Sequence, residues 1–272
     1  MKKTVLITGA SSGFGHQTAK LFQKEGWNVV ATMRSPEKEQ ELNQLPNVLV
    51  TRLDVEDQES ITEALEKANQ QFGSIDVLVN NAGYGIIGIF ESFTHEDWQK
   101  QYAINVFGMA DVTRSTLPYM RKQGSGTIIN VASFGGQVGM PIGSLYNSSK
   151  FAVEGISESL YYELDPLNIF VKIIEPGSVR STNFSKSMAM VKNEISAYDE
   201  LLSTFPLRLG AATANLAKAT AEDIASTIYE AATDGQSRLR YSVGADGQFY
   251  IEKKHQLSEQ EFTAFMHDIF TR

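Results

Sequence analysis

Two side chains that together could move a proton lie one helical turn apart in the middle of the chain. Tyr146 and Lys150 stand four positions apart, and residues with this spacing share one face of a helix. A tyrosine alone, with a pKa of about 10, is a poor base at neutral pH, but a neighbouring ammonium favours the phenolate and lowers that value. The pair is therefore a candidate for proton exchange with a carbonyl or alcohol oxygen. Such a pair in isolation is more often a buried tyrosine beside a surface lysine.

A glycine-rich turn near the N-terminus has the context of a nucleotide site. The apolar run 4–7 is typical of a buried strand, and a helix is expected directly after the turn. Glycines there permit a tight turn, close approach of the backbone to a pyrophosphate and packing of the helix on the strand, while the helix N-terminus favours phosphate. The spacing is GxxxGxG, not the general GxGxxG, and a turn without a ligand is the alternative. The expected cofactor contacts in this turn are Gly9, Ser11, Ser12, Gly13, Phe14 and Gly15.

The end of the second expected strand bears on the choice between NAD and NADP. Many NAD sites carry an acid there, which holds the adenine-side ribose hydroxyls. This chain has Thr32, Met33 and Arg34 instead, so no acid repels a 2′-phosphate and Arg34 can pair with one. We therefore expect NADP, with NADPH preferred over NADH; a surface arginine in a charged loop is the alternative.

Strand-like and helix-like segments alternate along the chain. The alternation predicts right-handed βαβ units and hence an α/β fold of the Rossmann type, a doubly wound, mostly parallel sheet of about seven strands with helices on both faces. Ligands of such sheets bind beyond the carboxyl ends of the strands, where the glycine turn, Ser133 and Pro176 all fall. The expected strands cover 4–8, 28–33, 48–53, 77–80, 127–133, 170–176 and 240–243, and the expected helices lie near 14–25, 59–72, 95–122, 145–164 and 221–234.

With these motifs in place, the chain resembles the short-chain dehydrogenase/reductase family, in its compact single-domain branch, over about residues 4–185. Residues 8–15 match the TGxxxGxG motif of that family, and 80–83 match its NNAG motif. Residues 80–88 also look like the steroid- and retinoid-related subgroup. Each motif alone has a plain structural explanation, such as a turn or a helix cap, but their common order favours the family. The catalytic set of the family corresponds here to Asn105, Ser133, Tyr146 and Lys150.

The resemblance implies a role for each of these residues. Tyr146 would exchange a proton with the substrate oxygen, Lys150 would lower the pKa of Tyr146 and hold the nicotinamide ribose, and Ser133 would stabilise charge on that oxygen. Asn105 would support a water-linked proton path to Lys150. Ser181 and Thr182 are both candidates to bind the nicotinamide carboxamide. Further cofactor contacts implied by the resemblance are Asp54, Val55, Asn81, Ala82, Gly83, Tyr146, Lys150, Pro176, Gly177, Val179 and Thr182.

Bulk composition narrows the class of protein. The 272 residues, 42 % hydrophobic and 21 % charged, suit a single oxidoreductase domain covering 1–272. A net charge of −8 argues against nucleic acid or an anionic membrane as partner. The absence of cysteine excludes disulfides and thiolate chemistry, and the four scattered histidines predict no metal site. With no apolar leader and no apolar run of about 18 residues, we expect a cytoplasmic protein.

Two segments near the C-terminus lie outside the alternation of strands and helices. Residues 183–220 include Met188, Met190 and Phe205, and we expect an insertion that covers the cofactor and lines the substrate cavity. A helix-turn-helix packed as core is the alternative. Residues 257–270 carry an apolar helical stripe that would pack on the domain, on a partner subunit or at the substrate mouth.

These features together predict an NADP(H)-dependent oxidoreductase that interconverts a carbonyl and an alcohol by hydride transfer, with Tyr146 as general acid/base. The apolar insertion favours a lipophilic substrate, and the resemblance implies a homodimer or homotetramer built through 95–122 and 145–164. Two alternatives stay open. One is an epimerase or dehydratase on the same scaffold, which the short chain disfavours. The other is a non-catalytic nicotinamide sensor, which the complete catalytic set disfavours.

Overall fold

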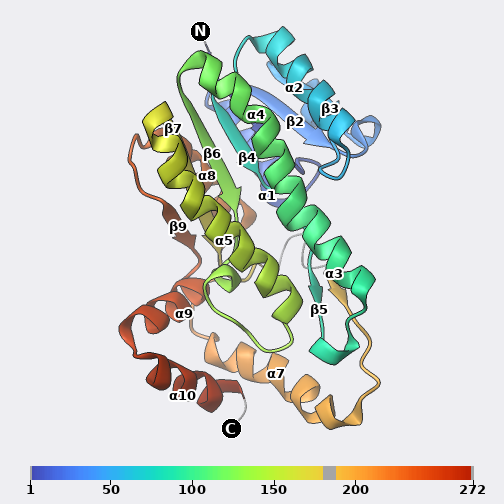
Figure 1. The fold of residues 1–272 in the computed structure, drawn as a ribbon, viewed down its shortest axis with the longest axis vertical. Coiled ribbons are helices and arrows are strands. Elements are labelled where there is room, and N and C mark those ends of the chain that lie inside the picture. The colour runs from blue at the N-terminus through green and yellow to red at the C-terminus, as the bar shows by residue number, and fades with distance from the viewer. Residues whose placement is uncertain (1, 180–187, 271–272) are drawn as a thin grey trace.

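Seven parallel strands form the centre of the molecule (Figure 1). The structure is a computed structural model that describes residues 2–179 and 188–270. The strand order is β3-β2-β1-β4-β6-β7-β9, so the chain reverses its direction of travel across the sheet between β1 and β4. The strands are β1 (Thr4–Ile7), β2 (Asn28–Met33), β3 (Val48–Arg52), β4 (Val77–Asn80), β6 (Gly126–Val131), β7 (Ile169–Pro176) and β9 (Arg240–Val243).

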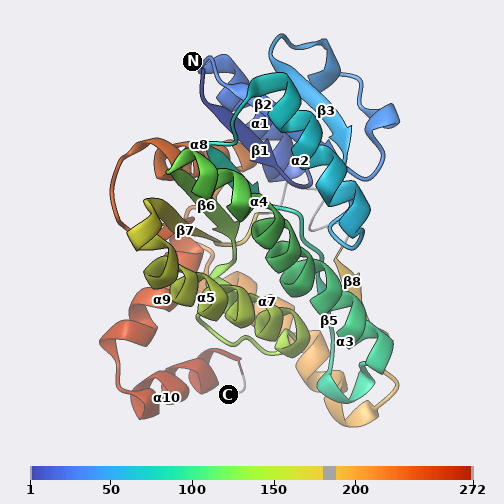
Figure 2. The ribbon, with the colours of Figure 1, turned by 45° about the horizontal axis from the view of Figure 1, so that its top comes forward.

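Helices cover both faces of this sheet, because each parallel strand must be followed by a crossover. On one face lie α1 (Gly13–Lys24) and α8 (Ala221–Thr233). On the other lie α2 (Gln58–Phe72), α4 (Met109–Gln123) and α5 (Ser144–Leu164), which Figure 2 shows across the front of the molecule. The predicted Rossmann-type, doubly wound sheet is therefore confirmed.

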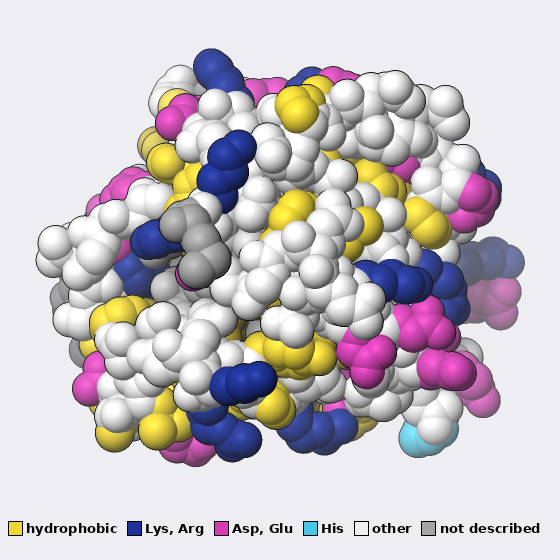
Figure 3. All heavy atoms as spheres, turned by 90° about the horizontal axis from the view of Figure 1, so that it is seen from above, with side chains coloured by type: hydrophobic (Ala, Val, Ile, Leu, Met, Phe, Trp, Pro, Cys, Tyr) yellow, Lys and Arg dark blue, Asp and Glu magenta, His cyan; other side chains and the backbone are white. Residues whose placement is uncertain are grey.

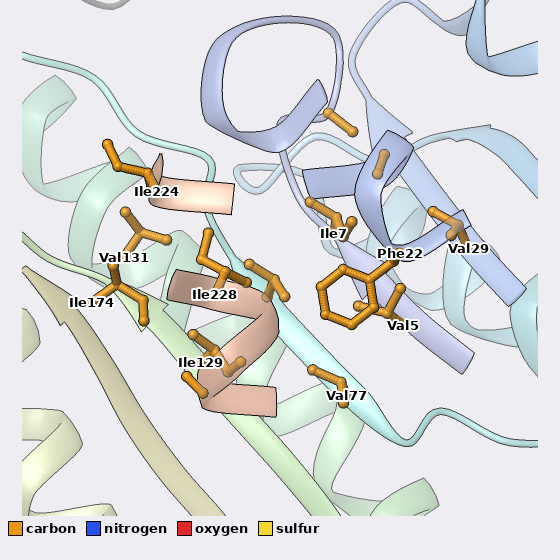
Figure 4. Packing of buried hydrophobic residues seen from close by; sticks show 14 of the residues in the cluster. Val5, Ile7, Phe22, Val29, Val77, Ile129, Val131, Ile174, Ile224 and Ile228 are labelled. Atoms are coloured by element: carbon orange, nitrogen blue, oxygen red, sulfur yellow. The ribbon is translucent and has the colours of Figure 1, made fainter. Parts of the chain in front are cut away.

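Alternating side chains of the buried strands supply the two cores. In β1, Val5 and Ile7 pack against the α1 and α8 side, whereas Leu6 belongs to the opposite cluster. Figure 4 shows Phe22 of α1 and Ile228 of α8 on the Val5 side of the sheet. Strands buried on both faces are apolar throughout, which is why β1 is the unbroken run Thr-Val-Leu-Ile.

A third apolar cluster lies beyond the carboxyl ends of the strands. It joins α7 (Asp199–Ala212), α9 (Ala245–Gln256) and α10 (Glu259–Phe270), which occupy the lower end of Figure 1. Its buried members are Val138, Phe205, Tyr250, Ile251 and Phe270. A two-stranded sheet of β5 (Ile86–Ile87) and β8 (Ala189–Met190) flanks it. In the described part of 183–220, the structure thus has a short strand and one long helix, not a helix-turn-helix.

The single helix expected over 95–122 is interrupted. The chain forms α3 (His95–Tyr102), then a π-helical segment (Ala103–Gly108), then α4. The Asn105 side chain within this segment bonds to the Tyr84 backbone, and a methyl group at Gly108 would lie 2.7 Å from Val55. These tertiary contacts favour the wider turn. Short 3₁₀ turns occur at Pro36–Lys38, Leu42–Gln44, Phe90–Ser92, Phe134–Gly136, Asp165–Leu167 and Ser196–Tyr198.

Three further features of the described residues concern the surface charge, the helices and the groups that could hold a metal ion. Acidic and basic side chains lie among one another on the face seen in Figure 3, which presents no continuous basic area. None of the helices described is both long and apolar enough to cross a membrane. Within residues 2–179 and 188–270, no group of three His, Asp or Glu side chains is placed to hold a metal ion.

Replacing Phe22 by alanine tests the core between α1 and α8. The Phe22 side chain is fully buried, with its ring centroid 5.0 Å from those of Trp27 and Tyr229. Phe22→Ala should lower the free energy of unfolding by about 3–5 kcal/mol, measured by urea denaturation. Phe90→Ala, at a position 64 % exposed, is the control and should lower it by about 1 kcal/mol or less. Equal effects would contradict this packing.

Candidate active site

A cavity of about 760 Å³ opens at the carboxyl ends of the central strands. Its walls come from the segments that follow β1, β2, β3, β4, β6 and β7, and it spans the β1/β4 position where the strand order reverses. A cavity of this volume accommodates a cofactor. The predicted site residues that line it are Gly9, Ser11, Ser12, Gly13, Phe14, Arg34, Asp54, Val55, Asn81, Ala82, Gly83, Ser133, Tyr146, Lys150, Pro176, Gly177 and Val179.

Two predicted site residues in the described part of the chain are not among the residues that line this cavity. Gly15 and Asn105 lie behind the cavity wall, where both are buried. Thr182 lies outside the described residues, as does its competitor Ser181.

The glycine turn is held against the segment that follows β4 by contacts that leave no space for a side chain. A methyl group at Gly15 would lie 2.5 Å from both Asn81 Nδ2 and the Gly9 carbonyl oxygen, and one at Gly9 would lie 2.9 Å from Ala82 Cα. The Asn81 amide donates hydrogen bonds to the carbonyls of Thr8 (2.9 Å) and Gly9 (3.1 Å). Gly9 also has a φ of +68°, which favours glycine.

The geometry of this turn suits a dinucleotide. Helix α1 begins at Gly13, and Gly13 and Phe14 line the cavity, so the free N–H groups of its first turn lie at the cavity wall. Such a helix N-terminus favours a phosphate. The residues present therefore fit a pyrophosphate-containing cofactor along the turn.

Ser133 and Tyr146 meet on the opposite wall. Ser133 lies directly after β6 and caps a short 3₁₀ turn, where its Oγ accepts a hydrogen bond from the Gly135 N–H at 3.1 Å. Tyr146 lies in the first turn of α5 and is hydrogen-bonded to the Ser133 side chain. The two hydroxyl groups, thirteen residues apart in sequence, thus face the same cavity.

Lys150 lies one turn further along α5 and is almost fully buried. Its Nζ donates a hydrogen bond to the Val131 carbonyl at 2.9 Å and lies 5.9 Å from the Tyr146 ring centroid. Burial lowers the pKa of Lys150 to about 8, and the nearby Glu154 carboxylate opposes this change. At neutral pH the amine is therefore mostly charged, but close to losing its proton.

Lowering of the pKa of Tyr146 by Lys150 stays a prediction, because other groups dominate that pKa in this geometry. Tyr146 is partly buried at the cavity wall, and this burial raises the pKa of Tyr146 to about 12, with the Ser133 hydrogen bond acting in the opposite direction. The Lys150 amine is turned toward the Val131 carbonyl. Tyr146 is consequently a protonated phenol at neutral pH.

Asn105 stands behind Lys150 within the π-helical segment. Its Oδ1 accepts from the Tyr84 N–H (2.8 Å), and its Nδ2 donates to the Tyr84 carbonyl (2.8 Å) and to Ser149 Oγ (3.1 Å). A methyl group at Gly83 would lie 3.7 Å from Asn105 Oδ1 and 3.9 Å from Lys150 Nζ, so both groups approach the same glycine. The structure brings Asn105 to the lysine although it does not line the cavity.

Arg34, Asp54 and Val55 lie together at the far end of the cavity. Arg34 follows β2 and is exposed, with its side chain at the cavity wall. Asp54 and Val55 follow β3, and the Asp54 carboxylate accepts from the Glu56 N–H at 3.2 Å. The adjacent ends of β2 and β3 therefore place a cation and an acid at the wall of the same cavity.

Several cavity residues were missed by sequence reasoning. Tyr84 and Phe134 directly follow the NNAG motif and Ser133, so their position in sequence could have identified them. Two other cavity residues are Lys100 of α3 and Ile104 of the π-helical segment, and the Lys100 Nζ lies 4.7 Å from the Tyr84 ring centroid. No sequence motif marks them, because this helical stretch reaches the cavity only through tertiary packing.

Comparison with known proteins agrees with this architecture. Residues 3–192 match the family model for short chain dehydrogenases. The chain belongs to the short chain dehydrogenase family. An uncharacterized oxidoreductase, YusZ of Bacillus subtilis, is 38 % identical over 257 residues, which is 89 % of each protein. The structure of a short-chain dehydrogenase from Streptomyces avermitilis is 34 % identical, with a TM-score of 0.85 over 97 % of this chain and 96 % of that one.

Structures of family members with bound cofactor are also similar. A 3-ketoacyl-(acyl-carrier-protein) reductase from Brucella melitensis, complexed with NADH, is 26 % identical, with a TM-score of 0.75 over 89 % of this chain and 97 % of that one. ElxO with NADP bound is 30 % identical, with the same TM-score and coverage. Neighbours in the family thus bind either nicotinamide cofactor. The resemblance to the steroid- and retinoid-related subgroup stays a prediction.

Replacing Gly15 by alanine tests the packing of the glycine turn. The added methyl group must displace Asn81 or the Gly9 carbonyl, so Gly15→Ala should lower the free energy of unfolding by about 1–3 kcal/mol and weaken NADPH binding. Gly155→Ala is the control, because nothing lies within 4 Å at that exposed helical position and alanine favours helix. Denaturation and NADPH fluorescence titration distinguish the two, and identical behaviour would contradict the packing.

Proposed function

We propose that this protein is an NADP(H)-dependent oxidoreductase that interconverts a carbonyl and an alcohol, with Tyr146 as general acid/base. The observation that carries the proposal is the hydrogen-bonded pair of Tyr146 and Ser133 at the wall of the cavity, with the Lys150 amine one helical turn away. A nicotinamide cofactor, when bound, supplies or accepts the hydride. The chain itself orients the substrate oxygen and moves the proton.

The protonation state of Tyr146 supports reduction at neutral pH. A phenol with a pKa near 12 carries its proton, so it is ready to donate to a carbonyl oxygen that gains charge. Ser133 Oγ, which is bonded to Tyr146, would turn its single proton to the same oxygen and so give that oxygen a second hydrogen bond. Lys150 would hold the nicotinamide ribose and supply positive charge beside the phenolate that forms.

The remaining wall of the cavity supports an apolar substrate. Phe134 adjoins Ser133, and Met188 and Leu209 approach from the C-terminal part of the chain. Phe134 is fixed by stacking on Tyr250, with a centroid separation of 6.0 Å. A carbonyl flanked by hydrocarbon would bury that surface here, whereas a strongly polar substrate would leave its groups unpaired.

The end of β2 supports NADP over NAD. Arg34 is the residue after β2, and its exposed guanidinium at the cavity wall would pair with a 2′-phosphate. Asp54 lies at the next strand end and would contact the adenine.

Exposed aromatic residues support a homo-oligomer. Phe107, at the junction with α4, and Tyr162 of α5 are 61 % and 66 % exposed, and Phe151 of α5 is 41 % exposed. Large apolar side chains on neighbouring helices favour association through that face, in a dimer or tetramer.

The first test of the proposal is replacement of Tyr146 by phenylalanine. NADPH consumption is followed with a panel of steroid, retinoid, aliphatic and quinone carbonyls. Loss of the proton donor should reduce turnover by about 10²–10⁴-fold, while NADPH affinity stays nearly the same. Tyr162→Phe, on the exposed side of α5, should leave turnover unchanged. Full activity in Tyr146→Phe would refute the role assigned to the phenol.

The second test is replacement of Arg34 by alanine. Removing a charge-assisted hydrogen bond to the 2′-phosphate should raise the Kd of NADPH by about 10- to 100-fold and leave that of NADH unchanged. Both constants are measured by fluorescence titration. Arg121→Ala, in the last turn of α4, serves as the control for general charge effects. An equal loss of NADPH and NADH affinity in Arg34→Ala would contradict the NADP assignment.

A further inference from the structure

A buried carboxylate lies directly beyond the catalytic lysine. Glu154 follows Lys150 by four residues and Tyr146 by eight on α5, so the three side chains form one column along the helix. Glu154 is 5 % exposed and Lys150 is 6 % exposed. A carboxylate this deeply buried needs a compensating charge, because its desolvation is otherwise unfavourable.

One arginine lies among three carboxylates at this position. Arg240 of β9 approaches Glu154 Oε2 at 3.0 Å and Glu175 Oε1 of β7 at 3.7 Å, both through its Nε. Its Nη2 binds the half-exposed Glu158 of α5 at 2.6 Å. A single guanidinium therefore compensates Glu154 incompletely.

Glu175 has further donors, whereas Glu154 has an oxygen without one. Glu175 accepts hydrogen bonds from Gln137 and from Ser242 Oγ, the latter at 2.7 Å. Glu154 Oε1 is buried and accepts no hydrogen bond from any residue that the structure describes. The charged groups of the described elements around Glu154 are Glu158 and Lys150 of α5, Glu175 of β7 and Arg240 of β9. The second cation in this group is Lys150.

A glycine lets the turn after β6 pack closely on this part of the column. A methyl group at Gly136 would lie 2.9 Å from the Lys150 carbonyl oxygen and 3.0 Å from Glu154 Cγ, so the turn after β6 packs directly on α5 between the two residues. In such an environment of low dielectric constant, the attraction between a carboxylate and an ammonium is stronger than at the surface.

We propose that Glu154 is a positioning residue that acts through Lys150, because its carboxylate keeps the buried amine in the ammonium form. The effect on turnover rests on the proposed function, since it requires Lys150 to act beside Tyr146. The effect on the Lys150 charge does not rest on the proposed function.

The pKa values of Glu154 and Lys150 predict how the charge on Lys150 changes with pH. Burial, together with the neighbouring Glu175, raises the pKa of Glu154 to about 7, and Glu154 opposes the burial that lowers the pKa of Lys150 to about 8. Below the first value Glu154 gains a proton, but Lys150 keeps its own because the solution is then more acidic than the pKa of the amine. Above the second value Lys150 loses its proton. The carboxylate therefore acts on the alkaline side, where it raises the pH at which the ammonium is lost.

The experiment compares pH profiles of kcat/KM for the native protein, Glu154→Gln and Glu158→Gln. The first substitution keeps an oxygen for Arg240 but removes the charge, so the alkaline limb should move down by about one pH unit. Glu158→Gln, which loses a charge on the same arginine but one turn further from Lys150, should keep the alkaline limb of the native protein. A merely structural Glu154 would lower kcat at every pH without moving a limb, and that result would overturn the proposal.

A second measurement does not depend on turnover. The ¹³Cε resonance of Lys150 in lysine-labelled protein, assigned by its loss in Lys150→Met, reports the titration of the amine directly. Its midpoint should fall in Glu154→Gln and stay native in Glu158→Gln. Glu154→Met removes the charge without burying a polar group, so the midpoint must fall in this variant as well. It replaces the glutamine variant in the experiment if that variant does not fold. An unchanged midpoint in a folded variant overturns the inference, whereas inactivity of the native protein on every substrate would count against the proposed function alone.

Discussion

The close contact between the turn after β1 and the segment after β4 is the constraint on which the rest of the site depends. Backbone and amide atoms meet there at distances that leave no space for a β-carbon at Gly9 or Gly15. The contact fixes the start of α1, and with it the N–H groups at the cavity wall. It also fixes the chain from Asn81 to Tyr84, against which Asn105 forms its hydrogen bonds. One close approach at the centre of the sheet thus positions both the glycine turn and the segment that Asn105 contacts.

Burial sets the chemistry at the other wall. The α5 helix places a phenol and an amine in a region where charge is unfavourable, so Tyr146 retains its proton and Lys150 tends to lose its own. The carboxylate of Glu154 opposes the second effect from within the same helix. Two effects determine which groups carry protons near neutral pH. One is burial, and the other is the negative charge of the carboxylates that Arg240 compensates only in part. The four-residue spacing of Tyr146 and Lys150 does not determine it alone.

Sequence patterns were sufficient for the elements with strong local signals. The seven strands are apolar runs between turns, and a parallel sheet requires that their carboxyl ends meet at one edge, so the meeting of the glycine turn, Asn81, Ser133 and Pro176 was predictable. The interruption of the helix expected over 95–122 was not, because the π-helical turn depends on contacts of Asn105 and Gly108 with segments distant in sequence. Lys100 and Ile104 were missed at the cavity for the same reason.

The family, the alternation of strands and helices, and the residue types at the site could be predicted from the amino-acid pattern, because they depend on local spacing and on the apolar periodicity. The electrostatics of the site could not, because they depend on tertiary contacts. Whether Lys150 lowers the pKa of Tyr146 depends on the direction of its amine and on the loss of water around both groups, and neither is encoded in a four-residue spacing. The cluster of Glu154, Glu175 and Arg240 likewise joins a helix to two strands, and their separation in sequence concealed it.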